Sequence, residues 1–262
     1  MNKIVFLNAA SINFDHEIDF SSLKNIGTFT MYDESQHDEI LKNVANQNVI
    51  ITKEIPLSKE LIDQFPSSVK LICEAGTGYN NIDLQAATNK GIRVCNIPGY
   101  STEAVAQLAI TLMLNLSSSI VQQQKMIERK DFSNFTNHLQ VPHFELQNKT
   151  LGLIGTGEIG QQVIKIARAL GMDVLTYSRT PKKFDDPRVK SASLDDLLKQ
   201  SDFVSIHCPL TDETKHLIDI NKLKLMKPTA FIINTARGAI IKETDLIDAL
   251  QKGIIAGAGL DV

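Results

Sequence analysis

The chain has 262 residues, of which 43% are hydrophobic and 22% are charged, close to the composition of ordinary globular proteins. This excludes a disordered, fibrous or collagen-like chain. The 27 basic and 30 acidic residues leave a net charge of −3, so no binding to nucleic acid through bulk charge is expected. No run of about 20 apolar residues predicts a membrane span. The three cysteines form no C-x-x-C pair, so we expect no metal site, no disulfide framework and a reduced, cytoplasmic setting.

The N-terminal part of the chain alternates between short β-branched runs and helical spacing of apolar residues. The predicted strands are Ile4–Leu7, Thr28–Tyr32, Val49–Thr52, Val69–Cys73 and Ile92–Asn96. The predicted helices are Asp38–Ala45, Lys59–Phe65 and Asp83–Lys90. This alternation indicates crossover connections and a mostly parallel sheet, whose strands we expect to be buried because they are apolar throughout.

A turn-rich stretch, Asn96–Tyr100, interrupts this alternation, and we place a domain boundary there, giving domains 1–98 and 99–262. A long helix is predicted over Thr102–Arg129, followed by a polar loop over Lys130–Lys149. The strands expected after it are Leu151–Gly155, Asp173–Tyr177, Phe203–His207, Thr229–Asn234 and Ile255–Asp261. The helices between them are Gln161–Leu170, Leu194–Gln200, Ile220–Met226 and Glu243–Lys252. The sequence therefore predicts a two-domain α/β protein with doubly wound parallel sheets.

A glycine motif lies where the first strand of the second domain meets its helix, with Gly155, Gly157 and Gly160 in the spacing G-x-G-x-x-G. In a dinucleotide-binding unit, the first glycine allows a tight turn, the second lets the backbone approach a diphosphate, and the third lets the helix pack on the sheet. An ordinary tight turn is the alternative. The strand before and the helix after favour dinucleotide binding, with the diphosphate on the amides of Thr156, Gly157, Glu158 and Ile159.

The second strand of such a unit normally ends in Asp or Glu, which binds the ribose hydroxyls. Here the strand is followed by Ser178, Arg179 and Thr180 instead. An arginine binds a 2′-phosphate, which an acid would repel, so NADP(H) is favoured over NAD(H). The alternative is that Arg179 lies along the adenine and accepts either cofactor.

Several motifs occur in a fixed order and together resemble the D-isomer-specific 2-hydroxyacid dehydrogenases, in particular the glycerate dehydrogenase/hydroxypyruvate reductase branch. Besides the glycine loop they are Gly76-Thr-Gly-Tyr-Asn-Asn-Ile-Asp83, Pro98-Gly-Tyr-Ser-Thr-Glu-Ala-Val-Ala-Gln107, His207-Cys-Pro-Leu210, Asn234-Thr-Ala-Arg-Gly238 and Gly259-Leu-Asp-Val262. The resemblance covers the whole chain. It implies a flavodoxin-like substrate domain, a Rossmann-type dinucleotide-binding domain, and an active site in the cleft between them.

The resemblance also implies roles for individual residues. Arg237 is expected to bind the carboxylate of the 2-oxo acid and to polarise its carbonyl, with a structural salt bridge as the alternative. The amides of Thr77 and Gly78 would bind the same carboxylate, and Tyr79 would shape the pocket. The nicotinamide half of the cofactor would lie among residues from several segments, namely Val105, His207, Cys208, Pro209, Thr214, Thr235, Ala236 and Asp261.

One departure from the family pattern concerns the proton donor. The family uses a histidine paired with a glutamate, both located after the G-L-D-V motif in which this sequence stops. His207 belongs to the cofactor segment and is not expected to replace that histidine. We therefore expect a C-terminally truncated chain whose substrate domain is incomplete, and residues 1–262 alone to bind cofactor weakly and to turn over very slowly.

The sequence thus predicts an oxidoreductase that passes a hydride between NAD(P)H and a small 2-oxo or 2-hydroxy acid. Hydroxypyruvate/D-glycerate and glyoxylate/glycolate are the favoured pairs. The alternative is a cofactor-sensing binding protein on the same scaffold, similar to the co-repressor relatives of the family. The predicted helix Thr102–Arg129 carries much apolar surface, and relatives dimerise through this region, so a homodimer is expected.

Overall fold

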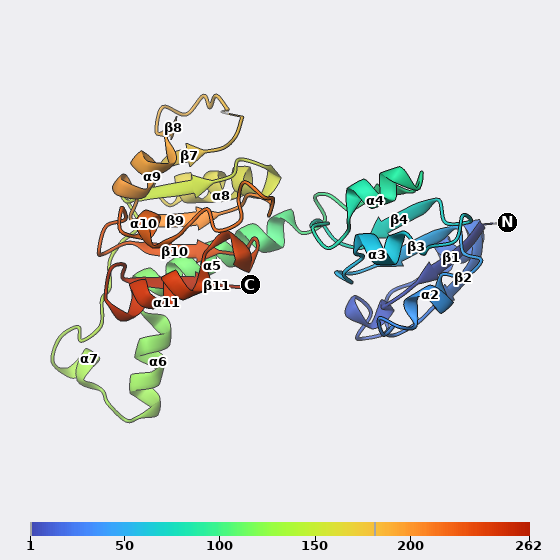
Figure 1. Cartoon of the computed structure of the whole chain (residues 1–262). Coiled ribbons are helices and arrows are strands. Elements are labelled where there is room, and N and C mark those ends of the chain that lie inside the picture. The colour runs from blue at the N-terminus through green and yellow to red at the C-terminus, as the bar shows by residue number, and fades with distance from the viewer. Residues whose placement is uncertain (1, 181) are drawn as a thin grey trace. The chain divides into compact units, whose positions relative to one another are not determined.

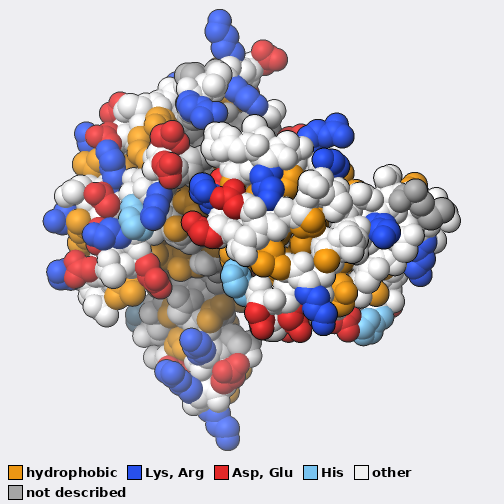
Figure 2. All heavy atoms as spheres, turned by 45° about the vertical axis from the view of Figure 1, so that its right-hand side comes forward, with side chains coloured by type: hydrophobic (Ala, Val, Ile, Leu, Met, Phe, Trp, Pro, Cys, Tyr) orange, Lys and Arg blue, Asp and Glu red, His pale blue; other side chains and the backbone are white. Residues whose placement is uncertain are grey.

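The computed structural model describes residues 2–180 and 182–262. Its internal contacts divide the chain into two compact units, here called the N-terminal and the C-terminal unit (Figure 1). The first ends at Tyr100 and the second begins at Ser101. On the face that Figure 2 presents, acidic and basic side chains are interspersed.

The N-terminal unit contains one parallel sheet with the strand order β2-β1-β3-β4-β5. This is the flavodoxin order, in which the chain changes direction across the sheet between β1 and β3. The strands are β1 (Asn2–Phe6), β2 (Gly27–Met31), β3 (Val49–Thr52), β4 (Leu71–Glu74) and β5 (Arg93–Cys95). The helices are α1 (Ser21–Ile26), α2 (Ile40–Asn43), α3 (Lys59–Ile62) and α4 (Leu84–Asn89), with a 3-10 turn at Ala9–Ser11.

The main hydrophobic cluster of the N-terminal unit lies on one face of this sheet, while Ile4 and Phe6 of β1 are buried on the other. Ile50 and Ile72 pair in register and are fully buried among side chains of α2, α3 and α4. The alternate positions of β3 and β4 are only half-buried. The expectation that every strand residue would be buried was therefore wrong for these strands.

The C-terminal unit contains a six-stranded parallel sheet in the order β11-β10-β9-β6-β7-β8. Counted from β6, this is the Rossmann order, with the change of direction between β6 and β9. The strands are β6 (Thr150–Ile154), β7 (Asp173–Tyr177), β8 (Val189–Ser191), β9 (Phe203–Ile206), β10 (Phe231–Asn234) and β11 (Gly257–Leu260). The prediction of an α/β fold with doubly wound parallel sheets is confirmed.

Helices cover both faces of the six-stranded sheet (Figure 1). One face packs against α5 (Thr102–Ser118) and α8 (Glu158–Ala169), where Phe203 and Phe231 stack at 5.3 Å between ring centroids. The other face packs against α9 (Leu194–Gln200), α10 (Ile220–Leu223) and α11 (Glu243–Gln251). A 3-10 turn, Gly238–Ile240, follows β10.

The predicted long helix over Thr102–Arg129 is in fact two helices, α5 and α6 (Ile120–Glu128), which are bent by 59°. Ser119 between them has a left-handed backbone with φ of 49°, and its hydroxyl donates a hydrogen bond to the Pro142 carbonyl at 2.6 Å. A single residue in this conformation ends the helical hydrogen bonding without disturbing the apolar spacing. The sequence pattern therefore concealed the break.

Three further elements escaped prediction. The stretch Lys130–Lys149 contains a short helix, α7 (Ser133–Thr136), and is not loop throughout. Helix α1 and strand β8 were missed because neither contains a run of apolar residues. Among the described residues no single helix has the length and hydropathy to cross a bilayer, and only the bent pair α5–α6 passes that test by length and composition alone.

Candidate functional site

The turn after β6 has a backbone that only glycine fits. Gly155 has φ of +99°, and its N–H donates to the Tyr177 carbonyl at 2.8 Å. A Cβ atom on Gly155 would lie 2.6 Å from the backbone nitrogen of Cys208 and 2.7 Å from the His207 carbonyl oxygen. The turn is therefore packed directly against the segment that follows β9.

The other two glycines of the motif have opposite surroundings. Gly157 is exposed, has an ordinary φ of −68°, and a Cβ added to it would meet no atom within 4 Å. A Cβ on Gly160 would lie 2.2 Å from the Gly155 carbonyl oxygen, so α8 begins in close contact with the turn. The first N–H groups of a helix have no partner within that helix and favour an anion. The open space at Gly157 beside these amides fits a diphosphate.

The end of β7 carries hydroxyls and an arginine, as the sequence indicates. The Thr156 hydroxyl donates to the Ser178 hydroxyl at 3.2 Å, and the Ser178 hydroxyl donates to the Thr180 carbonyl at 2.8 Å. Arg179 is exposed. The pKa of Glu213 is lowered, first by a hydrogen bond from Thr211 and to a smaller extent by the charge of Arg179. The guanidinium therefore lies close enough to the 211–215 loop to interact electrostatically with it.

Two buried polar atoms without a partner follow the neighbouring strands β9 and β10. The His207 ring places Nε2 2.8 Å from the Ser205 hydroxyl, whereas its Nδ1 is buried and has no hydrogen-bond partner in the described structure. The Thr235 hydroxyl is also buried and unpartnered there. Burial lowers the pKa of His207 to about 4 and raises the pKa of Cys208 to about 11. Unsatisfied buried polar atoms at the carboxyl ends of parallel strands fit a group bound at this edge.

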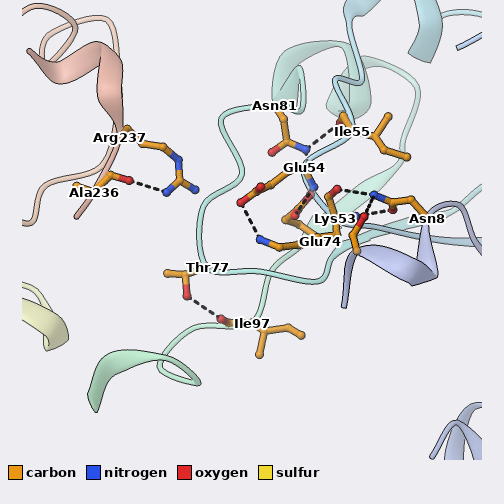
Figure 3. Close-up of polar contacts among 11 residues, drawn as sticks. Asn8, Lys53, Glu54, Ile55, Glu74, Thr77, Asn81, Ile97, Ala236 and Arg237 are labelled. Atoms are coloured by element: carbon orange, nitrogen blue, oxygen red, sulfur yellow. Dashed lines mark hydrogen bonds and ion pairs between the residues drawn. The ribbon is translucent and has the colours of Figure 1, made fainter. Parts of the chain in front are cut away.

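Arg237 sits in a loop that Asn234 holds in place. The buried Asn234 side chain donates to the Arg237 carbonyl at 2.9 Å and accepts from the Ala236 N–H at 3.0 Å. The half-buried Arg237 side chain donates from Nη1 to the Ala236 carbonyl at 2.7 Å (Figure 3). Asn234 was not predicted to have a positioning role. Its signal in the sequence is an Asn directly at the end of an apolar strand, where Asn commonly binds nearby backbone.

The remaining predicted cofactor residues of the C-terminal unit differ in their exposure and in their hydrogen bonds. The Thr214 hydroxyl accepts from the Thr211 N–H and donates to the Pro209 carbonyl, both at 2.7 Å, so it shapes its own loop. The Asp261 side chain is exposed, and its N–H donates to the Asn234 carbonyl at 3.1 Å. Val105 is half-buried on the first turn of α5. The structure thus gathers the glycine turn, the 207–209 segment and the 235–237 loop at one edge of the sheet.

In the N-terminal unit, the predicted substrate residues form the loop after β4. The Thr77 hydroxyl donates to the Ile97 carbonyl at 3.2 Å (Figure 3). The Asn96 side chain donates to the Thr77 carbonyl at 2.7 Å. Gly78 is half-buried, and Tyr79 is 46% exposed. Contacts with the 96–97 segment thus hold this loop.

A buried carboxyl group next to this loop escaped the sequence analysis. Glu74, at the end of β4, is buried and accepts hydrogen bonds from the Glu54 N–H and the Asn81 side chain, each at 2.9 Å. Burial raises the pKa of Glu74 despite these bonds. Its signal in the sequence is an acid that ends an otherwise apolar strand. Among the described residues, no three His, Cys, Asp or Glu side chains are grouped to hold a metal ion.

Comparison with known proteins gives consistent matches. The sequence profile of the D-isomer specific 2-hydroxyacid dehydrogenase NAD-binding domain matches residues 110–262. A hydroxypyruvate reductase of Blautia hydrogenotrophica is 34% identical over 99% of this chain and 82% of its own length. A glyoxylate reductase of Thermococcus litoralis is 41% identical over 85% of this chain and 69% of its own length.

The structural comparison agrees with the sequence comparison. A D-lactate dehydrogenase of Aquifex aeolicus, solved with NAD and lactic acid, superposes with a TM-score of 0.88 at 31% identity, covering 99% of this chain and 77% of that one. The matched profile, which describes an NAD-binding domain, covers the glycine turn and the whole six-stranded sheet. The chain therefore belongs to the D-isomer specific 2-hydroxyacid dehydrogenase family, a family of oxidoreductases with an NAD-binding domain.

Proposed function

We propose that this protein reduces a small 2-oxo acid with NADPH or NADH, either hydroxypyruvate to D-glycerate or glyoxylate to glycolate. The observation that carries the proposal is the convergence at one sheet edge of the glycine turn, two unpartnered buried polar atoms and the loop of Arg237. The names of the Blautia and Thermococcus relatives support these two substrates.

The cofactor-binding residues follow from this arrangement. The amides of Thr156 to Ile159 bind the diphosphate, and Gly157 leaves room for it. The Thr235 hydroxyl and His207 Nδ1 take polar partners from the bound cofactor, and Asp261 holds the carboxamide. When bound, the cofactor supplies the hydride. Further contacts come from residues named in the sequence analysis, namely Val105, Cys208, Pro209, Thr214 and Ala236.

Arg237 is the proposed substrate-binding and catalytic residue. Its guanidinium pairs with the substrate carboxylate and polarises the carbonyl, an interaction worth about 1.5–3 kcal/mol for a charge-assisted hydrogen bond. Asn234 holds the loop backbone from which this side chain projects. In the N-terminal unit, the amides of Thr77 and Gly78 are the proposed partners for the substrate, with Tyr79 beside them.

NADP(H) is the proposed preferred cofactor. Ser178 and Thr180 follow β7 where an acid would exclude a 2′-phosphate, and the exposed Arg179 provides the positive charge that such a phosphate requires.

His207 is not the proton donor in this proposal. Burial holds its pKa at about 4, so its ring is neutral near pH 7 and carries no imidazolium proton to transfer.

The test is the absorbance of reduced cofactor at 340 nm, followed with the purified protein, NADPH or NADH, and hydroxypyruvate or glyoxylate. We expect slow oxidation that scales with protein concentration, because no residue of this proposal acts as proton donor. Arg237→Gln should lower kcat/KM at least about tenfold, whereas the exposed Arg129→Gln serves as a charge-matched control and should not. Absence of oxidation with every pair of cofactor and acid would reject the proposed reaction.

A further inference from the structure

Two cysteines lie side by side at the ends of neighbouring strands in the N-terminal unit. Cys73 of β4 and Cys95 of β5 pair in register, and the Cys95 thiol donates to the Cys73 sulfur at 3.3 Å. Both are free thiols. They are 22 residues apart in the chain, so it is the pairing of the strands that brings them together. None of the sequence motifs includes them.

The two thiols face away from the main hydrophobic cluster of the unit. Successive side chains of a strand point to opposite faces of the sheet. Ile72 and Val94, the residues before the two cysteines, pack in that cluster, so Cys73 and Cys95 project from the other face. Cys95 is exposed and Cys73 is half-buried. A dissolved oxidant therefore reaches Cys95 first.

The geometry of the pair suits a disulfide bond. Neighbouring strands lie about 4.7–4.9 Å apart, and the Cα atoms of a disulfide are usually about 4.4–6.8 Å apart. The two sulfur atoms need to approach by about 1.3 Å to reach the S–S bond length of about 2.0 Å, a shift that side-chain rotation can provide. A structural zinc ion takes four ligands, and among the described residues no third His, Cys, Asp or Glu joins this pair.

We propose that Cys73 and Cys95 form a reversible redox site, which a peroxide converts to an intramolecular disulfide that restrains the 76–79 loop. In the first step, the Cys95 sulfur bonds to one oxygen of hydrogen peroxide as the O–O bond breaks, giving a sulfenic acid and water. In the second step, the Cys73 sulfur bonds to the Cys95 sulfur, the S–O bond breaks, and the hydroxide leaves as water with the Cys73 proton. The two thiols lose two electrons, which the peroxide gains. A dithiol reductant reverses the reaction by exchange.

The surroundings of the two thiols give them different roles. Burial raises the pKa of Cys73 to about 12, so this thiol stays protonated near pH 7 and reacts poorly with a peroxide by itself. The exposed Cys95 takes the oxygen, and Cys73, which is already in contact with it, closes the disulfide. Exposed disulfides are labile and typical of regulatory sites, whereas structural disulfides resist reduction.

The 76–79 loop is held by the two residues that follow β5. The Asn96 side chain donates to the Thr77 carbonyl at 2.7 Å, and the Ile97 N–H donates to the Gly76 carbonyl at 3.0 Å. The Thr77 hydroxyl donates to the Ile97 carbonyl (Figure 3). A covalent bond between the ends of β4 and β5 joins the two sides of this hydrogen-bonded set and limits its opening. Since Thr77 is a proposed substrate partner, oxidation acts at substrate binding under the proposed function.

The experiment exposes the reduced protein, freed of reductant, to a small excess of hydrogen peroxide. The intact mass should fall by about 2 Da, and Cys208 should be the one thiol still open to alkylation after unfolding. Amides of the 76–79 loop should exchange with deuterium at least about threefold more slowly, and dithiothreitol should restore both the mass and the exchange. Cys95→Ser should abolish both effects. Cys208→Ser, a matched control that removes the third thiol, should keep them.

Cys73→Ser provides an independent check. Without the second thiol, Cys95 should gain oxygen atoms of about 16 Da each and form no internal disulfide. The inference would be overturned by thiols that all stay free, by oxygen gain in the unmodified protein without loss of 2 Da, or by a disulfide that leaves exchange of the 76–79 loop unchanged. A mass loss that survives Cys73→Ser or Cys95→Ser would also overturn it. None of these measurements uses turnover, so absence of NADPH oxidation would reject the proposed reaction and leave this site standing.

Discussion

Substitution by alanine should have different effects at Gly155 and at Gly157, the two glycines of the turn after β6. Gly155→Ala forces a side chain onto a backbone with φ of +99° and brings its Cβ to 2.6 Å from the Cys208 nitrogen. The left-handed backbone alone costs about 1–2 kcal/mol, and the clash with backbone atoms adds to it. For a unit of this size we expect the melting temperature to fall by at least about 4 °C.

Gly157→Ala should instead leave stability nearly unchanged and weaken cofactor binding. The backbone at Gly157 has φ of −68°, and an added Cβ meets no atom within 4 Å. Any destabilisation comes from losing glycine at the helix N-cap and should stay below about 1 kcal/mol. The added methyl occupies the space that a diphosphate needs. Loss of one charge-assisted hydrogen bond of about 1.5–3 kcal/mol corresponds to a roughly 10- to 100-fold weaker affinity.

The assay is a titration with NADPH, followed by the fluorescence of the reduced nicotinamide, beside a thermal melt of each variant without cofactor. An unchanged NADPH affinity in Gly157→Ala would show that no diphosphate approaches this turn. A melting temperature of Gly155→Ala equal to that of the unmodified protein would show that the turn is not rigid in the way described.

Three further outcomes are expected. Arg179→Ala should weaken NADPH about tenfold or more and NADH by less than about threefold, and equal losses in the two titrations would refute a role in 2′-phosphate binding. The unfolded chain protonates His207 below about pH 6.5 but the folded protein only near pH 4, so the free energy of unfolding should fall as the pH drops between these values. This decrease in the free energy of unfolding is about 3 kcal/mol, and it should be missing when His207→Gln is titrated with urea over the same pH range. Light scattering at micromolar concentration should give a dimer, since α5 and α6 expose apolar side chains (Leu114, Ile120, Val121 and Ile127), and a monomer would contradict this expectation.

The sequence was most informative where structure depends on neighbours along the chain. Strands such as β3 and β7 and the helix α9 were predicted with the bounds that the structure shows, because each is a compact apolar run or a regular helical pattern. The glycine turn was predictable because its three glycines occur in a characteristic spacing between a strand and a helix, although the packing of Gly155 against the 207–208 segment was not.

What the sequence could not reveal depends on contacts between distant segments. The burial of the Glu74 carboxyl group is explained only by its hydrogen bonds from the Glu54 N–H, in the loop after β3, and from the Asn81 side chain, in the loop that follows Glu74 itself. The unpartnered atoms of His207 and Thr235 likewise become visible only once neighbouring strands are aligned. A left-handed residue such as Ser119 carries no signal in apolar spacing, so the break in the helix was missed.

The packing of α5 has a consequence for synthesis on the ribosome. This helix opens the C-terminal unit, yet it packs against β10 and β11, which are made far later. Gly259 permits the contact, since a Cβ there would lie 3.0 Å from the Cβ of Leu112. The helix α8 is translated earlier and can cover part of α5, but the apolar side chains of α5 that contact β10 and β11 stay uncovered until those strands are made. We expect this nascent segment to recruit chaperones, because β11 is translated long after α5.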